Sequence, residues 1–379
     1  MNPERKRIAF QIVLFVVTFI TATIAGYEWV YGQSVLVNGM TWANFISGLP
    51  YSISFLLILS VHEFGHYITA RYHQIKTSLP YYIPLPPLPL FFGTLGALIR
   101  IRQRIPTTTK NFDIGIAGPL AGFAMALVIL CYGFLTLPPP EYIFQIHPDY
   151  QQFGLDYASH VYTPEFLKGG MDIILGNNIL FSFLSEMLAD PSRMPNEHEL
   201  MHYPFLFAGY LSLVFTALNL MPVGQLDGGH VVYGMFGAKW HRAIATTVFL
   251  TYVCFAGLGV ITPGQLGNDV IWHIPLYIGF LYFTFLGLGF DKRTTLIISM
   301  AMFLFQYIAV MIMPGIKGFH GWLLFAFLLG RFVGVRHPGA ETEEPLTPER
   351  KILGWIALLI LIVCFTPSPM EVISYEPTL

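Results

Sequence analysis

Apolar runs separated by short polar, proline-rich or glycine-rich stretches organise this chain of 379 residues. Many of the runs approach the length of about twenty residues that a helix needs to cross a bilayer. The pattern therefore predicts an all-α polytopic membrane protein with about nine transmembrane helices. We expect these spans near residues 8–26, 50–71, 112–135, 204–221, 243–262, 272–290, 294–313, 321–335 and 352–366.

One proline-rich segment, residues 80–101, departs from the helical pattern. Its prolines exclude a continuous helix, and apolar residues alternate from Thr94 to Ile101. A PxxP recognition motif fits the letters, but Phe91, Phe92 and Leu95 favour burial in protein or membrane. We predict a small re-entrant β segment, a strand or hairpin, within the bilayer.

Composition excludes a water-soluble globular protein, because 54% of the residues are hydrophobic and 11% are charged, with a mean hydropathy of +0.59. The net charge of −2 gives no basis for a nucleic-acid partner. Cys131, Cys254 and Cys364 each lie alone in an apolar run and are interpreted as packing residues.

The N-terminus combines the basic residues Arg5–Arg7 with the apolar run Ile8–Gly26, which also resembles a secretory signal peptide. The run has the length of a membrane span, so we expect an uncleaved first helix. Because no serine-rich, acidic-poor transit segment precedes it, we expect a bacterial inner membrane rather than a plastid.

Basic residues predict the orientation. Placing Met1 in the cytoplasm leaves only Lys168, Arg193 and Lys317 of the 20 basic residues outside. The hydrophilic insert 136–203 then lies outside. We interpret its histidines as ordinary surface histidines and its stretch Met171–Leu188 as an amphipathic interfacial helix. The histidines are His147, His160, His198 and His202.

The second predicted span contains the motif HExxH, as His62, Glu63 and His66. A spacing of four residues places both imidazoles on one helix face, where they can hold one zinc ion while Glu63 acts on a bound water. Ionisable side chains within a span are costly and are usually functional. The alternative is a hydrogen-bonded polar cluster that stabilises the helix bundle.

A third zinc ligand must come from elsewhere, because zinc hydrolases usually have three protein ligands and an open fourth position. The glutamates of the insert lie on the opposite side by the predicted orientation. Asp227 follows the fourth span on the same side as the two histidines, and Pro222 and Gly224 break the helix before it. Asp227 is therefore the candidate, with a solvated loop aspartate as the alternative.

Two motifs carry a family resemblance. HEFGHYITAR at 62–71 and NLMPVGQLDGGH at 219–230 resemble the paired signatures of the site-2 protease family, and the glycines of Ala117–Gly122 resemble an element between them. The resemblance covers about residues 45–240, a catalytic core that includes the insert, between an N-terminal helix and loop at 1–44 and further helices at 241–379. No PDZ or CBS pattern is recognised, as in the compact branch of the family.

The resemblance implies that His62, His66 and Asp227 bind zinc and that Glu63 transfers the protons of hydrolysis. It also implies that Asn219 holds the substrate backbone or the developing oxyanion, with capping of the broken helix as the alternative. His230 matches the pattern, and we assign it to packing or support of the ligands.

The expected function is thus a zinc-dependent intramembrane endopeptidase acting on transmembrane protein substrates in the lipid bilayer. The substrate helix must unwind to be cut, and Phe92–Ile101 offers it a strand edge. An inactive relative and a zinc or proton transporter are the alternatives. All four motif residues are present, and no two related halves with paired broken helices are recognised. The substrate and the oligomeric state are open.

Overall fold

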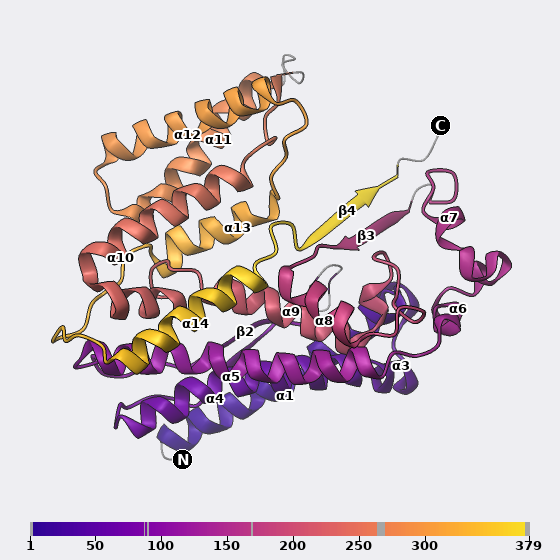
Figure 1. Cartoon of the computed structure of the whole chain (residues 1–379), viewed down its shortest axis with the longest axis horizontal. Helices are drawn as coiled ribbons and strands as arrows, with labels where there is room; N and C mark the ends of the chain where they lie inside the picture. Colours follow the sequence, from indigo (N-terminus) through magenta and orange to yellow (C-terminus); the bar gives the residue numbers. More distant parts are fainter. Residues whose placement is uncertain (1–2, 87, 89–90, 168–169, 264–269, 376–379) are drawn as a thin grey trace. The chain divides into compact units, whose positions relative to one another are not determined.

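The computed structural model describes residues 3–86, 88, 91–167, 170–263 and 270–375 (Figure 1). The described chain is mainly helical, with two small antiparallel sheets of two strands each. It forms two compact units. The first contains Met1–Gln103, Ala117–Leu218 and Leu359–Leu379, and the second contains Arg104–Ile116 and Asn219–Leu358. The division into an N-terminal helix, a core and C-terminal helices stays a prediction.

The first unit begins with the long helices α1 (Pro3–Tyr31) and α4 (Leu49–Tyr72). The short helices α2 (Val35–Asn38) and α3 (Trp42–Ser47) lie between them in the sequence. Gly26 allows a close approach, because a Cβ atom there would lie 2.7 Å from Cδ1 of Tyr51 on α4. The hydroxyl of Thr23 on α1 donates a buried hydrogen bond of 2.8 Å to Oγ of Ser52. The first helix is thus an integral part of this unit.

A β-hairpin follows α4. Strands β1 (Tyr81–Pro84) and β2 (Thr94–Leu98) pair in antiparallel register, with Tyr81 opposite Leu98. The predicted strand or hairpin in this segment is confirmed. The hairpin is attached to α1, because the hydroxyl of Thr21 donates to the carbonyl of Gly93 at 2.7 Å. Gly93 has a φ of +81° and lies so close to Ala22 that no Cβ would fit.

The C-terminal part of helix α5 (Thr108–Leu135) belongs to the first unit, as does nearly all of α9 (Pro204–Asn219). Between them the insert contains the short helices α6 (Ile143–Ile146) and α7 (Ala158–Val161) and the 3-10 segments Pro140–Tyr142, Pro148–Asp156 and Leu200–His202. Tyr150, Tyr157 and their neighbours form a small hydrophobic core within the insert. The insert is therefore a folded part of the unit.

The expected interfacial helix over Met171–Leu188 is wrong in its first part. Met171–Leu175 form strand β3, which pairs with β4 (Met370–Ser374), and only Ile179–Leu188 form a helix, α8 (Figure 1). Gly176 interrupts the run, and Asn178 caps α8 by accepting from the backbone N–H of Phe181 at 2.9 Å. The sequence around Met171 does not show this strand, because its partner β4 lies almost 200 residues further along the chain.

The second unit contains α10 (Asp227–Ala256), α11 (Val270–Phe285), α12 (Lys292–Ile312) and α13 (Gly321–Leu328), which continues as a π-helix to Val333. It also contains the N-terminal part of α14 (Pro348–Cys364). Helices α11 and α12 pack side by side (Figure 1). Helix α10 is kinked at Gly237, whose φ of +75° lies outside the helical region.

Helices occur at all nine positions where spans are predicted. Four of the described helices are long and apolar enough to cross a membrane: Glu4–Tyr31, Leu49–Tyr72, Thr108–Leu135 and Lys292–Ile312. These four support an integral membrane protein. The remaining helices are shorter or less apolar, so the count of nine transmembrane helices stays a prediction.

Candidate metal site

The HExxH residues lie on one buried face of α4. His62, Glu63 and His66 expose 6%, 5% and 7% of their surface, whereas Phe64 and Ile68 on the other face expose 39% and 62%. The apolar exposed face suits lipid, and the buried face holds the ionisable groups away from it. The spacing of four residues therefore has the predicted effect of bringing both imidazoles together.

The two imidazoles face each other through their Nε2 atoms, which lie 3.1 Å apart. A carboxylate oxygen of Glu63 lies 4.0 Å from Nε2 of His62. Two nitrogens that share a tetrahedral zinc ion at about 2.0–2.1 Å are about 3.3 Å apart. The observed separation is close to this value, so the pair fits a shared zinc ion.

Glycines on α5 bring this helix against the histidines of α4. A Cβ atom at Gly118 would lie 2.1 Å from Nε2 of His66, and one at Gly122 would lie 2.9 Å from Cβ of His62. In the opposite direction, a Cβ at Gly65 would lie 2.7 Å from the carbonyl oxygen of Ala117. The predicted close helix contact at Ala117–Gly122 is confirmed.

Asp227 and Asn219 stand on either side of a helix break. Helix α9 ends at Asn219 and α10 begins at Asp227, and Gly224 between them has a φ of +58°. The predicted break of the helix is therefore confirmed. A Cβ at Gly228 would lie 1.8 Å from the carbonyl of Leu220, so the residue after Asp227 must be glycine for the chain to turn this way.

The structure brings together His62, Glu63 and His66, which all belong to the first unit. Asn219 and Asp227 belong to the second unit. The assignment of Asp227 as the third ligand and of Asn219 as a substrate-binding residue stays a prediction.

His230 packs within the second unit. Its Nδ1 lies 2.8 Å from Nε2 of His337, and the His337 ring stacks on Tyr233 with the centroids 4.2 Å apart. Asn111 lies 3.1 Å from the same Nε2 atom. These contacts agree with the packing role expected for His230.

The interpretation of the insert histidines as surface histidines holds for His160 and is wrong for His202. His160 is exposed, but His202 is buried, with 5% of its surface exposed, and His198 pairs with Asp172 at 2.8 Å. Burial lowers the pKa of His147. The many charged residues of the insert predict an exposed segment, and composition alone does not show that aromatic residues bury some of these histidines. The Glu199-x-x-His202 spacing was a signal, because residues three apart share a helical face.

Comparison with known proteins places these residues in a family. The model of Peptidase family M50 matches residues 50–261. A probable zinc metalloprotease EGY1 of Arabidopsis thaliana, described as chloroplastic, is 30% identical over 207 residues, which are 55% of this chain and 32% of that protein. The EGY2 protein of Oryza sativa subsp. indica, described in the same words, is 28% identical over 224 residues, 59% of this chain and 34% of that protein.

The alignments therefore span about a third of the length of these relatives. The family model, by contrast, covers more than half of this chain, including the HExxH residues and the segment from Asn219 to His230. On this evidence the chain belongs to Peptidase family M50, the site-2 protease family that its motifs resemble.

Proposed function

We propose that this protein is a zinc-dependent intramembrane endopeptidase that cleaves membrane-anchored proteins within or next to the bilayer. The observation that carries the proposal is the buried face of α4, where two imidazole nitrogens lie 3.1 Å apart beside Glu63 in a helix of span length. This helix lies in the part of the chain that matches Peptidase family M50.

His62 and His66 hold zinc in this proposal, and Asp227 is the third ligand. A set of two imidazoles and one carboxylate suits zinc and leaves a fourth position for water or substrate. Zinc supplies Lewis-acid polarisation of the scissile carbonyl and lowers the pKa of water. The names of the relatives, which include zinc metalloproteases, support the same choice of metal.

Glu63 is the general base and acid. Its carboxylate takes a proton from the attacking water and returns it to the leaving amine. Asn219 offers amide donors to the substrate backbone or to the oxyanion of the tetrahedral intermediate. Asn219 is the last residue of α9. The helix does not continue past it, and this position supports a substrate-binding role for its side chain.

A transmembrane substrate must expose its backbone before cleavage, and strand β2 is the proposed partner. The backbone N–H of Ser78 donates to Arg100, and that of Arg102 donates to Lys76. Arg100 and Arg102 therefore face the preceding segment, and we infer, by alternation back to Leu98, which pairs with Tyr81, that the N–H groups of Ala97 and Ile99 lie at the opposite edge. That edge is where an unwound substrate can add as a strand.

Proline substitution tests the β2 edge. We expect Ala97→Pro to slow cleavage strongly while zinc content is kept, because it removes a donor from the edge that faces away from β1. Leu98→Pro is the matched comparison, since it removes a donor from the pairing with β1. Unchanged cleavage by zinc-loaded Ala97→Pro protein would exclude strand addition at this position.

The function itself is tested with purified full-length protein, by zinc analysis and by cleavage of a transmembrane model substrate. We expect His66→Ala and Asp227→Ala to lose the zinc of this site, and both to lose cleavage. Full zinc content in Asp227→Ala would remove that residue from the ligand set. A zinc-loaded wild-type protein that cleaves no membrane substrate would favour the inactive-relative alternative.

The orientation and the compartment also belong to this proposal. The basic residues support a catalytic side that faces the cytoplasm, with the insert 136–203 on the other side. The expected compartment is the bacterial inner membrane. Fractionation of the native cells tests it, and recovery of the protein from a plastid membrane, the compartment in the names of the relatives, would contradict it.

A further inference from the structure

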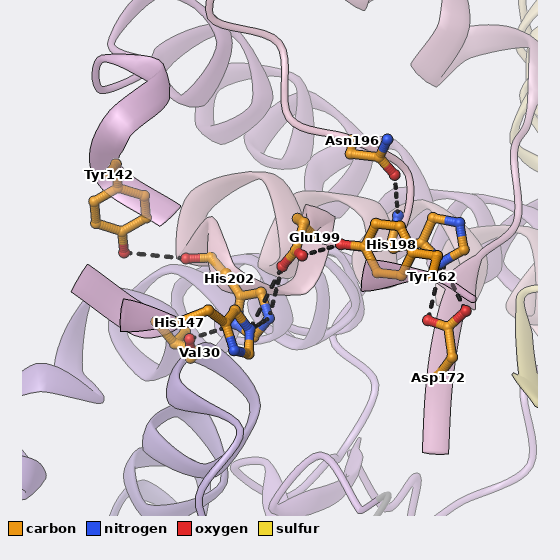
Figure 2. A network of polar contacts seen from close by, with 9 residues as sticks. All are labelled: Val30, Tyr142, His147, Tyr162, Asp172, Asn196, His198, Glu199 and His202. Carbon is orange, nitrogen blue, oxygen red and sulfur yellow. Dashed lines mark hydrogen bonds and ion pairs between the residues drawn. The ribbon is translucent and has the colours of Figure 1, made fainter. Parts of the chain in front are cut away.

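Three ligand-type side chains meet in the insert, within the first unit and apart from the HExxH residues (Figure 2). They are His147, which follows α6, and Glu199 and His202, at the 3-10 segment before α9. One ligand atom from each lies within 4.8 Å of the others. Glu199 and His202 are buried, with 2% and 5% of their surface exposed.

The distances among the three atoms describe a metal-sized triangle. Nε2 of His147 lies 3.2 Å from Nε2 of His202 and 3.7 Å from Oε2 of Glu199, and the third side is 3.1 Å. Two ligands of a tetrahedral zinc ion are about 3.3 Å apart. An ion about 2.05 Å from all three atoms would lie about 0.6 Å out of their plane, close to the roughly 0.7 Å of an ideal tetrahedron.

The tautomer of His202 also supports metal binding. Its Nδ1 lies 2.6 Å from the carbonyl oxygen of Val30, which can only accept, so Nδ1 carries the proton and donates. In the neutral ring, Nε2 then presents a lone pair to His147 and Glu199. A backbone carbonyl that fixes the tautomer of a metal-binding histidine is the usual support of such a ligand.

Glu199 is held by one of its two oxygens and leaves the other for a ligand. The hydroxyl of Tyr162 donates to Oε1. Oε2 is buried and makes no hydrogen bond, although Nε2 of His202 lies 3.1 Å away. A buried carboxylate oxygen without a partner is costly, and a cation in the triangle would remove this cost.

We propose that His147, Glu199 and His202 bind a second divalent transition-metal ion, zinc being the ion that suits two imidazoles and a carboxylate. The site joins two segments of the insert to the end of α1, through the bond from His202 to Val30. Its role is structural. The metal ties the insert to the first transmembrane helix and fixes the fold of a segment with little regular secondary structure.

Metal content of the full-length protein tests the proposal. The protein is stripped with a chelator, reloaded with zinc alone and analysed by mass spectrometry of the metal. We expect about two zinc ions per chain in the wild type, and about one each in His147→Ala and in His66→Ala. The double variant should hold almost none. His160→Ala, an exposed histidine of the same insert, is the matched control and should keep both ions.

This design separates the two metal sites. If His66→Ala alone abolishes all zinc while His147→Ala changes nothing, the second site does not exist and the first is unaffected. If His66→Ala loses none, the proposed active site fails while the second can still be read from His147→Ala. Glu199→Gln, which keeps the shape of the side chain, should also lose the second ion, so a misfolded alanine variant cannot mimic the result.

Proteolysis measures the structural role. Arg193 in the insert is half-exposed and is a site for trypsin. Zinc at about 100 times its Kd should slow cleavage there by about 100-fold if cleavage requires the metal-free, open insert. His147→Ala should lose this zinc protection and His160→Ala should keep it. Equal cleavage rates with and without zinc in the wild type would overturn the proposal that the metal ties the insert to α1.

Discussion

Replacing Gly118 by alanine tests how the helix contact holds the zinc ligands. The added Cβ would lie 2.1 Å from Nε2 of His66 and 2.4 Å from both neighbouring ring carbons. Ordinary contact needs about 3.5 Å, so the imidazole must move by about 1.4 Å. Zinc sites tolerate ligand displacements of about 0.2 Å, so the Gly118→Ala protein should bind zinc more weakly than the wild type.

The expected magnitude is a fall in zinc affinity of at least about tenfold, which corresponds to about 1.4 kcal/mol. The free energy of unfolding should fall by about 0–2 kcal/mol, because overpacking costs about 1–3 kcal/mol while alanine in a helix is about 1 kcal/mol better than glycine. Zinc titration and thermal unfolding of the purified protein measure the two effects separately, and cleavage of a model substrate should fall with the zinc content.

Gly133→Ala is the matched control on the same helix. Its Cβ would lie 2.9 Å from Cδ2 of Leu206 and 3.1 Å from Cβ of Phe205, so it is also overpacked, but it contacts no zinc ligand. We expect a similar change in stability with full zinc content. Full zinc content and cleavage in Gly118→Ala would show that the His66 ring does not pack against Gly118 in the zinc-bound protein, and would refute the reasoning.

Further predictions address the base, the second unit and the orientation. Glu63→Gln should keep its zinc and lose cleavage, since it removes a base and not a ligand; normal turnover would contradict the proposed mechanism. Asp113→Asn should lower the free energy of unfolding by about 1.5–3 kcal/mol, because Arg350 binds both oxygens of Asp113, at 2.7 and 2.9 Å. Adding Arg350→Met should cost little more, and additive losses would argue against coupling. A cysteine at 155 should be labelled from outside and one at 345 only after permeabilisation.

The sequence predicts the helices and the HExxH face well, and for a physical reason. Apolar length determines which segments can form membrane helices, and a spacing of four determines that His62 and His66 share a face. The break between Asn219 and Asp227 is equally local, because Pro222 and Gly224 act on their own backbone. Features of this kind need no knowledge of distant contacts.

The sequence does not predict features that depend on contacts between distant parts of the chain. Strand β3 forms against β4, and the His147 site forms only because Glu199 and His202 fold back onto a segment 52 to 55 residues earlier and onto Val30. Neither the β3–β4 pairing nor the contacts of the His147 site can be recognised in a short segment of the sequence. Composition was also misleading there, because a polar, acidic insert is normally exposed, whereas in this one tyrosines and histidines bury each other.

The small residues at the end of the first apolar run illustrate how one pattern has two physical causes. Small residues before Gly26 are typical of a signal-peptide cleavage site. In the structure they are small because α1 is crowded. Ala22 and Ala25 are fully buried, Ala22 meets the backbone of Gly93, and Gly26 meets Tyr51. Further along the same helix, Trp29 donates to the carbonyl of Phe91, and Val30 accepts from His202. Cleavage near residue 26 would remove Thr21, Ala22 and Thr23, and with them the contacts of α1 with Gly93 of the hairpin and with Ser52 of α4. N-terminal sequencing of the mature protein should therefore find the first helix intact, and a mature terminus near Tyr27 would contradict this account.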